Sequence, residues 1–265
     1  WVELENGENW FFHFQDKGVY GRIVHLQPLC WGADGWPQIG ERLNDTGKGQ
    51  PVSLHRLPAL PVAPCCLQTS DDFRHGQPGL QWQWQANPQR HWLTPHQQGL
   101  RLRCALTSGY ISLYRLPQLL LQKFPAERFD VQTAVEPMFF QDGDEAGIAI
   151  YGQRFAALCV TYRTANLQLA LCHGWIDDRG ETHQQSIGLE EVTGCKEIEL
   201  GFQVDYDGVV HFRYRLAQRE WRQVTPQFSA GAGKWIGARM GIYARSEREN
   251  VKGSAIFSPF IVRLQ

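Results

Sequence analysis

The feature that most constrains the fold is the series of short apolar segments that recurs from Asp71 to the end of the chain. Turn residues such as those at 142–143, 178–180 and 207–208 separate the segments, and no long amphipathic helical pattern interrupts them. Many strands at short spacing without helices between them predict an all-β, antiparallel sandwich, with about a dozen or more strands in two sheets. The predicted strands cover residues 100–105, 129–135, 146–151, 156–162, 167–173, 198–205, 209–214, 237–243 and 255–262.

The first 43 residues contain a smaller, separate group of strands. Residues 10–14 and 21–26 are apolar or alternating and flank a turn at 16–18, which predicts a hairpin. A second turn begins at Asp34-Gly35. These two or three strands amount to about one blade of a β-propeller, and a lone blade cannot bury its apolar face.

Residues 44–68 have a different character. Prolines and glycines recur there and the hydrophobic periodicity disappears, which is typical of a linker that its prolines partly extend. The sequence therefore predicts three parts: a blade fragment at 1–43, a linker at 44–68 and a sandwich at 69–265.

Charge and hydropathy argue against several classes of partner. The net charge of −1 and the isoelectric point near 6.8 give no case for nucleic acid or an anionic membrane. No apolar run approaches the roughly 18–20 residues that span a bilayer. The seven cysteines show no zinc-type spacing, and Cys104, Cys159 and Cys172 lie in apolar runs where we expect them to be buried. The compartment stays open between cytoplasm, periplasm and secretion.

Two stretches resemble a known enzyme family. Gly-Arg-Ile-Val-His-Leu-Gln-Pro at 21–28, with Asp-Gly-Trp-Pro at 34–37, resembles the last blade of glycoside hydrolase family 43, whose members are five-bladed propellers acting as β-xylosidases and α-L-arabinofuranosidases. The downstream chain resembles the concanavalin A-like sandwich that follows the propeller in many of them. The residues that carry this second resemblance are Asp-Asp-Phe at 71–73, Leu-Gln-Trp-Gln-Trp at 80–84, Asn-Pro at 87–88, Leu-Leu-Leu-Gln-Lys at 119–123 and Gly-Asp-Glu-Ala-Gly-Ile at 143–148.

The resemblance implies a glycosidase that hydrolyses xylosides or arabinofuranosides of hemicellulose with inversion. The family's three catalytic carboxylates belong to earlier blades, so we expect them upstream of Trp1. An inverting enzyme holds its acid and base about 6.5–9.5 Å apart, and no carboxylate pair in this chain convincingly supplies that arrangement. We expect this segment to be inactive alone, to stabilise the missing upstream propeller, and to shape an active-site mouth that receives xylo- or arabino-oligosaccharides.

The same resemblance points to three candidate binding residues. Arg22 corresponds to an arginine that contacts the bound sugar in related members; a surface salt bridge is the alternative. Trp235, in Lys-Trp-Ile-Gly at 234–237, corresponds to an aromatic residue that narrows the pocket mouth, and packing between domains is its alternative. His25 corresponds to a possible contact to a metal, often calcium, near the propeller axis, and a buried histidine with a hydrogen-bond partner is the alternative. No cofactor is required, while calcium is possible.

Other candidates favour structural roles. Clustered carboxylates lie mostly beside glycine or in polar turns, where aspartate accepts backbone N–H bonds. Trp82 and Trp84 share one face of a strand and could form a sugar platform, but packing inside the protein is favoured. At 255–260 the family's two acidic positions are lost, which argues against a calcium site there, and Pro259 predicts a sheet edge or a bulge. The carboxylate clusters lie at 71–72, 142–145, 177–178, 190–191 and 205–207.

Two further interpretations of the sandwich stay open. It could be a non-catalytic carbohydrate-binding module for xylan or arabinan, although fold alone does not establish glycan binding. It could also serve only to stabilise the propeller or its oligomer. The sequence does not distinguish xylose from arabinose.

Overall fold

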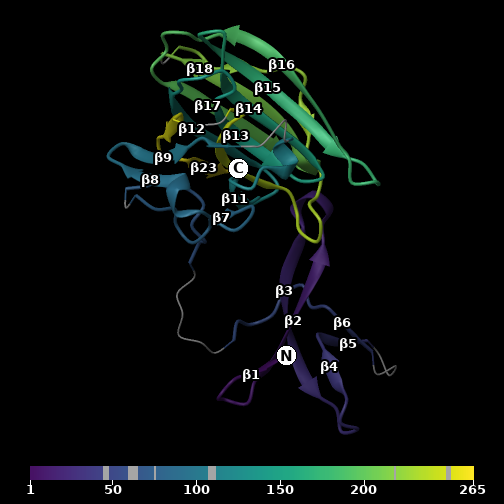
Figure 1. Cartoon of the computed structure of the whole chain (residues 1–265). Helices are drawn as coiled ribbons and strands as arrows, with labels where there is room; N and C mark the ends of the chain where they lie inside the picture. Colours follow the sequence, from purple (N-terminus) through teal and green to yellow (C-terminus); the bar gives the residue numbers. More distant parts are fainter. Residues whose placement is uncertain (44–47, 59–64, 75, 107–111, 218, 249–251) are drawn as a thin grey trace. The chain divides into compact units, whose positions relative to one another are not determined.

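The computed structural model describes residues 1–43, 48–58, 65–74, 76–106, 112–217, 219–248 and 252–265, and these form mostly antiparallel β-structure (Figure 1). Helical structure within these ranges is confined to single turns, and none of them has the length or apolarity needed to cross a bilayer. The predicted all-β class is confirmed. The turns are η1 (Gly18–Tyr20), η3 (Arg90–Trp92), η4 (Leu113–Arg115) and η5 (Tyr206–Gly208).

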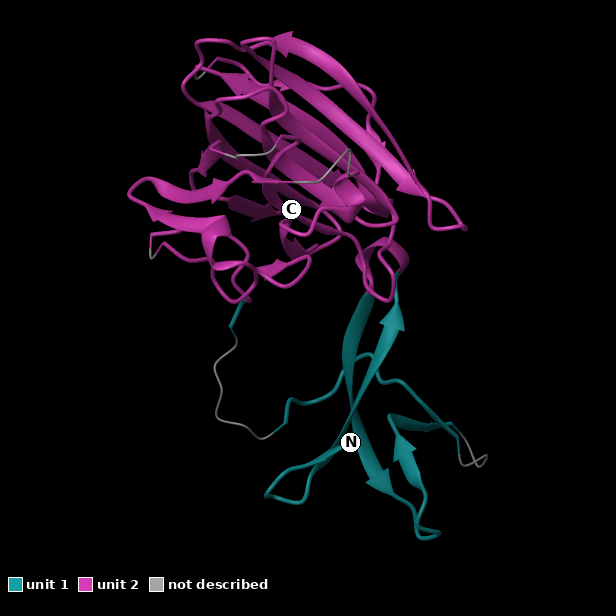
Figure 2. Cartoon of the chain, viewed as in Figure 1, with its two compact units in different colours: residues 1–17, 22–66 teal, residues 18–21, 67–265 magenta. Residues whose placement is uncertain are grey.

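The chain divides into two compact units (Figure 2). Unit 1 holds residues 1–17 and 22–66, and unit 2 holds residues 18–21 and 67–265. The four turn residues 18–21 therefore pack as part of unit 2, although the strands on either side of them belong to unit 1. The three-part division at 43 and 68 stays a prediction.

Unit 1 contains a four-stranded antiparallel sheet in the order β1-β2-β3-β4. Its centre is the predicted hairpin, in which β2 pairs with β3 from Asn9 opposite Leu29 to Asp16 opposite Arg22. A two-stranded sheet, β5 with β6, follows it, so part of the predicted linker is a strand. The bounds are β1 (Val2–Glu3), β2 (Asn9–Asp16), β3 (Arg22–Trp31), β4 (Pro37–Ile39), β5 (Glu41–Leu43) and β6 (Lys48–Gln50).

Unit 2 is a sandwich of an eight-stranded and a nine-stranded sheet, as predicted (Figure 1). The eight-stranded sheet has the order β16-β15-β14-β13-β21-β11-β7, with β10 beside β21. Its strands are β7 (Gln83–Trp84), β10 (Ala105–Leu106), β11 (Leu120–Lys123), β13 (Glu145–Tyr151), β14 (Arg154–Arg163), β15 (Asn166–Ile176), β16 (Thr182–Glu191) and β21 (Arg239–Ser246). The nine-stranded sheet has the order β19-β18-β17-β12-β22-β9-β8, with β20 paired to β18 and β23 paired to β12. Its strands are β8 (Leu93–His96), β9 (Gly99–Arg103), β12 (Phe129–Met138), β17 (Ile198–Asp205), β18 (Val209–Leu216), β19 (Arg222–Gln223), β20 (Phe228–Ser229), β22 (Ser254–Phe257) and β23 (Ile261–Leu264).

Two apolar clusters hold this sandwich together. The larger joins both sheets, with Ile148 and Ile242 from one and Val131 and Phe212 from the other. Because side chains alternate along a strand, Ala149 and its counterparts face the opposite way. They form a second cluster that side chains from residues 113–121 cover. Part of one outer face of the sandwich is thus buried by the protein's own chain.

Pro259 lies at a bulge and not at a sheet edge. β22 lies between β12 and β9, inside the sheet. β22 and β23 both pair with β12. Gln132 of β12 lies opposite Ile261 of β23, and Val135 of β12 lies opposite Phe257 of β22. The step is therefore three residues along β12 but four residues along the partner chain segment. One extra residue therefore bulges out at Ser258-Pro259, where a proline's missing N–H costs no ladder bond.

Candidate functional site

Trp235 lies on an exposed loop of unit 2 between β20 and β21. Its side chain is 70% exposed, and its backbone is in the left-handed region with φ of 68°. A non-glycine residue pays about 1–2 kcal/mol for that conformation. An exposed indole on a strained backbone is unusual, and strain of this kind concentrates at ligand-binding positions.

The end of this loop makes close backbone contact with the turn at residues 18–21. The Ala238 amide donates a 2.7 Å hydrogen bond to the Val19 carbonyl. A Cβ placed on Gly21 would lie 2.3 Å from the Gly237 nitrogen, so the two glycine backbones touch with no room for a side chain. Gly21 also has φ of 77°, which favours glycine for a second reason.

Tyr20 completes the attachment of this turn to unit 2. Its hydroxyl donates to the Glu127 carbonyl and accepts from the Gly208 amide, both at 3.2 Å. Burial of the ring raises the pKa of Tyr20, so the hydroxyl keeps its proton and can donate. Sequence reasoning missed this contact, because nothing in the sequence of residues 18–21 indicates which distant loops they meet.

Arg22 is the first residue of β3, and its side chain is exposed. The guanidinium carbon lies 4.6 Å from the centroid of the Phe14 ring, which is a cation–π distance. Arg22 follows Gly21 directly in the sequence and is the first residue of unit 1 after the turn. Its contact with a sugar stays a prediction.

His25 pairs across the hairpin with His13. The two rings stack with their centroids 5.2 Å apart, and in the described structure the Nε2 atom of each is buried without a hydrogen-bond partner. His25 is therefore not the buried histidine with a satisfied ring that the alternative expected. Calcium takes six to eight oxygen ligands, so two imidazoles do not fit it. Within the described residues no group of three or more His, Cys, Asp or Glu side chains could hold a metal ion.

The predicted carboxylate clusters are mostly engaged in local structure. Asp71 is buried and accepts from the Phe73 amide at 2.9 Å, the Gly79 amide at 2.8 Å and the Trp82 indole at 2.9 Å. Asp177 accepts from two backbone amides of its turn, and a hydrogen bond from His183 lowers the pKa of Asp177. These contacts fit the structural roles that the sequence favoured.

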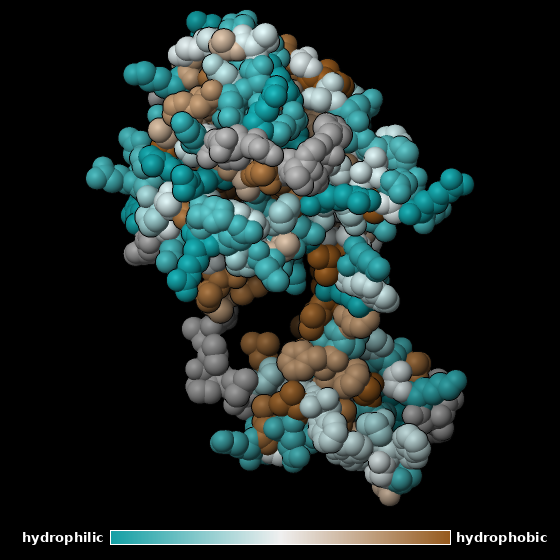
Figure 3. Space-filling model, in the orientation of Figure 1, coloured by the Kyte–Doolittle hydropathy of each residue, from teal (hydrophilic) through white to brown (hydrophobic). Residues whose placement is uncertain are grey.

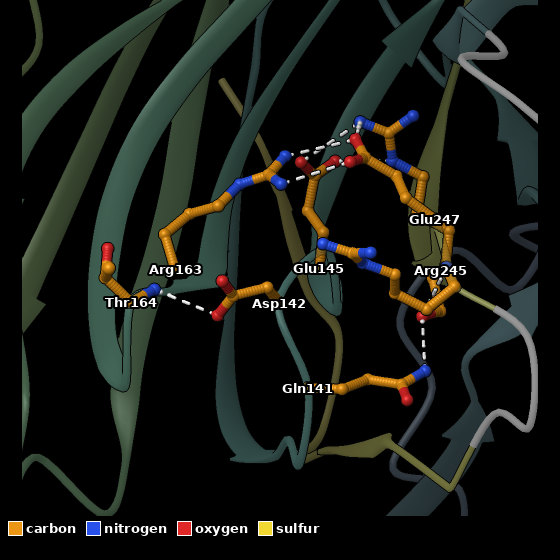
Figure 4. A network of polar contacts seen from close by, with 9 residues as sticks. Gln141, Asp142, Glu145, Arg163, Thr164, Arg245 and Glu247 are labelled. Atoms are coloured by element: carbon orange, nitrogen blue, oxygen red, sulfur yellow. Dashed lines mark hydrogen bonds and ion pairs between the residues drawn. The ribbon is translucent and has the colours of Figure 1, made fainter.

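Glu145 lies in the most deeply buried charged network (Figure 4). Arg245 donates to its two oxygens at 3.0 and 3.1 Å, and the Tyr243 hydroxyl donates at 2.6 Å. Burial alone would raise the pKa of Glu145, but the charge of Arg245 and these hydrogen bonds lower it overall. Nearby, Arg163 makes two 3.1 Å hydrogen bonds to Glu247. The network ties β13, β14 and β21 together.

Trp82 and Trp84 do not form a sugar platform. Trp82 is 8% exposed, bonds to Asp71, and packs against Phe260 with ring centroids 5.0 Å apart. Trp84 is half-buried and packs edge-on against Trp92. Packing inside the protein, which the sequence favoured for both, is confirmed for Trp82.

Residues 70–263 match the family described as the β-xylosidase C-terminal concanavalin A-like domain. A protein named putative β-xylosidase from Xylanibacter ruminicola is 28% identical over 241 residues, and a β-xylosidase from Formosa agariphila is 24% identical over 280 residues. Each alignment covers 91% of this chain but only 43% of the relative, so the chain spans less than half the length of these proteins.

A solved structure shares the fold of the whole chain. It belongs to a GH43 glycoside hydrolase whose engineered active site displays both endo-xylanase and exo-arabinofuranosidase activity. The TM-score is 0.79 at 21% identity, and the match covers 100% of this chain and 53% of that one. At this identity the likeness shows the fold alone.

Proposed function

The chain belongs to the family defined by the β-xylosidase C-terminal concanavalin A-like domain, and from this premise we propose that it is the C-terminal part of an inverting glycosidase acting on xylosides or arabinofuranosides of hemicellulose. The observation that carries the proposal is the family match across the sandwich together with relatives more than twice as long. In this proposal the catalytic carboxylates belong to the part of those relatives that this chain does not span.

The surface of unit 1 supports an upstream partner. Eleven of the 21 exposed large hydrophobic residues among those described belong to unit 1, which has less than a quarter of the chain. Figure 3 shows hydrophobic residues on the surface of unit 1. Apolar patches of this kind mark surfaces that pack against protein. The proposed occupant is the preceding blades of a propeller. The eleven are Trp1, Val2, Phe12, Phe14, Ile23, Val24, Trp31, Trp36, Leu43, Leu54 and Leu57.

Within this enzyme, Arg22 and Trp235 are the proposed substrate-binding residues. The planar guanidinium of Arg22 offers donors to sugar hydroxyls, and the exposed indole of Trp235 offers an apolar face to a sugar ring. The strained backbone of Trp235 and its nearby attachment through Gly237 support a positioned side chain over a mobile one. No metal enters the proposed chemistry, and a calcium ion near His25 would need oxygen ligands beyond His13 and His25.

An assay of the 265-residue chain tests the catalytic half of the proposal. We expect no release of nitrophenol from nitrophenyl xyloside or nitrophenyl arabinofuranoside. Turnover that disappears in Asp144→Asn or in another carboxylate variant, with the thermal midpoint unchanged, would place the chemistry in this chain and refute the proposal.

A carbohydrate-binding module that relies on Trp82 and Trp84 is not supported, because Trp82 is buried and Trp84 packs against Trp92. The purely stabilising role differs from our proposal in one measurable respect. It predicts that Trp235→Ala leaves substrate preference unchanged in the full-length enzyme, whereas our proposal predicts a change.

A further inference from the structure

The bulge at Ser258-Pro259 opens a hollow on the outer face of the nine-stranded sheet. Its volume is about 190 Å³, and it lies over β12 and the start of β17. Pockets for drug-sized ligands are roughly 300–1,000 Å³, so this hollow has room for one small ring. It is contained in unit 2 and does not involve the loop that carries Trp235.

Apolar residues form the floor and part of the walls of the hollow. Ala134 lies at its floor, while Pro259 and Ile261 line the side formed by the bulge. Trp221 lines it too and lies over Gly201, whose added Cβ would stand 3.4 Å from the indole ring. Small residues under a tryptophan thus leave space above a sheet that large outward side chains would otherwise fill.

Trp221 is held in place by two arginines of β18. The guanidinium carbons of Arg213 and Arg215 lie 4.8 and 4.9 Å from the centroid of its ring. Contacts of this kind contribute roughly 0.5 kcal/mol or more each and restrict the indole. The aromatic wall is therefore organised before any ligand arrives.

Several polar groups around the hollow are likewise fixed, although Glu197, which also lines it, is exposed. Arg215 forms a two-point ion pair with Glu199, and Arg213 donates to Asp130 at 2.8 Å. Gln132, at the edge of the hollow, accepts from Arg263 at 3.1 Å, which orients its amide. Carboxylate and oriented amide oxygens are acceptors, and they suit the hydroxyl donors of a neutral sugar better than an anion.

We propose that this hollow binds a single ring of a neutral sugar, as an accessory glycan-binding site of the sandwich. An apolar wall for ring C–H groups beside fixed polar groups for hydroxyls is the combination that a small polyhydroxy ring requires. Glu199 and Asp205 are six residues apart on β17, or about 20 Å, so the hollow lies at the opposite end of that strand from the turn at 206–208 that meets Tyr20. Binding in this hollow does not require Arg22 or Trp235 to bind substrate.

Calorimetry on the 265-residue chain with xylobiose and with α-1,5-arabinobiose tests the proposal. A shallow site for one ring predicts a Kd on the order of 1 mM for at least one of the two sugars. Trp221→Ala and Ala134→Leu, the second of which fills the floor and keeps Trp221, should each weaken binding by about tenfold or more. Trp175→Ala, which removes an exposed indole from β15 in the other sheet, is the matched control and should leave this Kd within about twofold.

Thermal unfolding of each variant checks that the sandwich is folded, and Ala134→Leu carries the test if Trp221→Ala does not fold. Binding that is lost in Trp235→Ala but kept in Ala134→Leu would assign the sugar to the other end of the sandwich and overturn the proposal. Absence of binding to either sugar at about 20 mM would overturn it as well.

Discussion

The contact between Gly21 and Gly237 makes a sharp prediction, because it leaves no space for a methyl group. In Gly21→Ala the new Cβ would stand 2.3 Å from the Gly237 nitrogen and 2.9 Å from the Gly237 Cα, both of which are backbone atoms. Neither atom can move without moving the chain, so we expect the turn at 18–21 to detach from the rest of unit 2.

The cost can be worked from the contacts that are lost. Detachment breaks the Val19–Ala238, Tyr20–Gly208 and Tyr20–Glu127 hydrogen bonds, which contribute about 1 kcal/mol each. The total of about 3 kcal/mol corresponds to roughly a 100-fold loss of protection against amide exchange.

Hydrogen exchange at the amides of Ala238 and Gly208 measures this directly, because both amides donate to the turn. Gly18→Ala is the matched control: Gly18 also has positive φ, at 57°, but an added Cβ would have nothing within 4 Å. In Gly18→Ala the protection against amide exchange should fall by only about five- to tenfold, which is the effect of backbone strain alone. Equal exchange rates in Gly21→Ala and Gly18→Ala would refute the close-contact argument.

Three further predictions concern the buried groups of unit 2. Glu145→Gln should lower the free energy of unfolding by about 3 kcal/mol at neutral pH, because the buried Arg245 loses its charged partner. A melting temperature that stays within about 2 °C of the wild-type value would contradict this. The pKa of Glu145 is lowered in the folded protein, so its stabilisation is present above its usual value near 4.5 and is lost as pH falls through the folded value. Acid titration should therefore narrow the stability gap between wild type and Glu145→Gln as pH falls below 4.5. A thiol reagent should modify the three exposed cysteines within minutes and leave three buried ones unmodified until the protein unfolds. The reason is that burial raises the pKa of each buried thiol, that of Cys172 to about 12. Rapid modification of all six would contradict the fold. The exposed set is Cys30, Cys65 and Cys66, and the buried set is Cys104, Cys159 and Cys172.

The strands that sequence reasoning found are those with apolar or alternating residues. The prediction for 198–205 matches β17 residue for residue, and 255–262 was a single predicted strand that the bulge at Pro259 divides into β22 and β23. Thr182–Glu191, which is β16, escaped prediction because it is a largely polar edge strand. Lys48–Gln50 escaped for a related reason, since a three-residue strand among prolines and glycines carries no periodic signal.

The candidate site was less accessible to sequence reasoning. Arg22 and Trp235 came from a family resemblance, whereas the contact that attaches the neighbouring backbone joins residues more than 200 positions apart in the sequence. The sequence predicted a role for Asp71 in a turn but not its partner. The hydrogen bond from Trp82 to Asp71 depends on how the chain folds back over eleven residues. Trp221 gave no signal at all, because its importance depends on the small residue Gly201 beneath it.

The most direct test of the central claim, that Trp235 of the sandwich binds substrate, is a comparison of kcat/KM between the proposed full-length enzyme and its Trp235→Ala variant. The substrates are nitrophenyl xyloside and nitrophenyl arabinofuranoside. We predict a loss of about tenfold, or roughly 1.4 kcal/mol of transition-state binding, on at least one substrate, with an unchanged melting temperature. Trp175→Ala, which removes another exposed indole from unit 2, is the control and should have little effect. If both variants retain full activity and the same substrate preference, the sandwich does not shape the active site and the account is wrong.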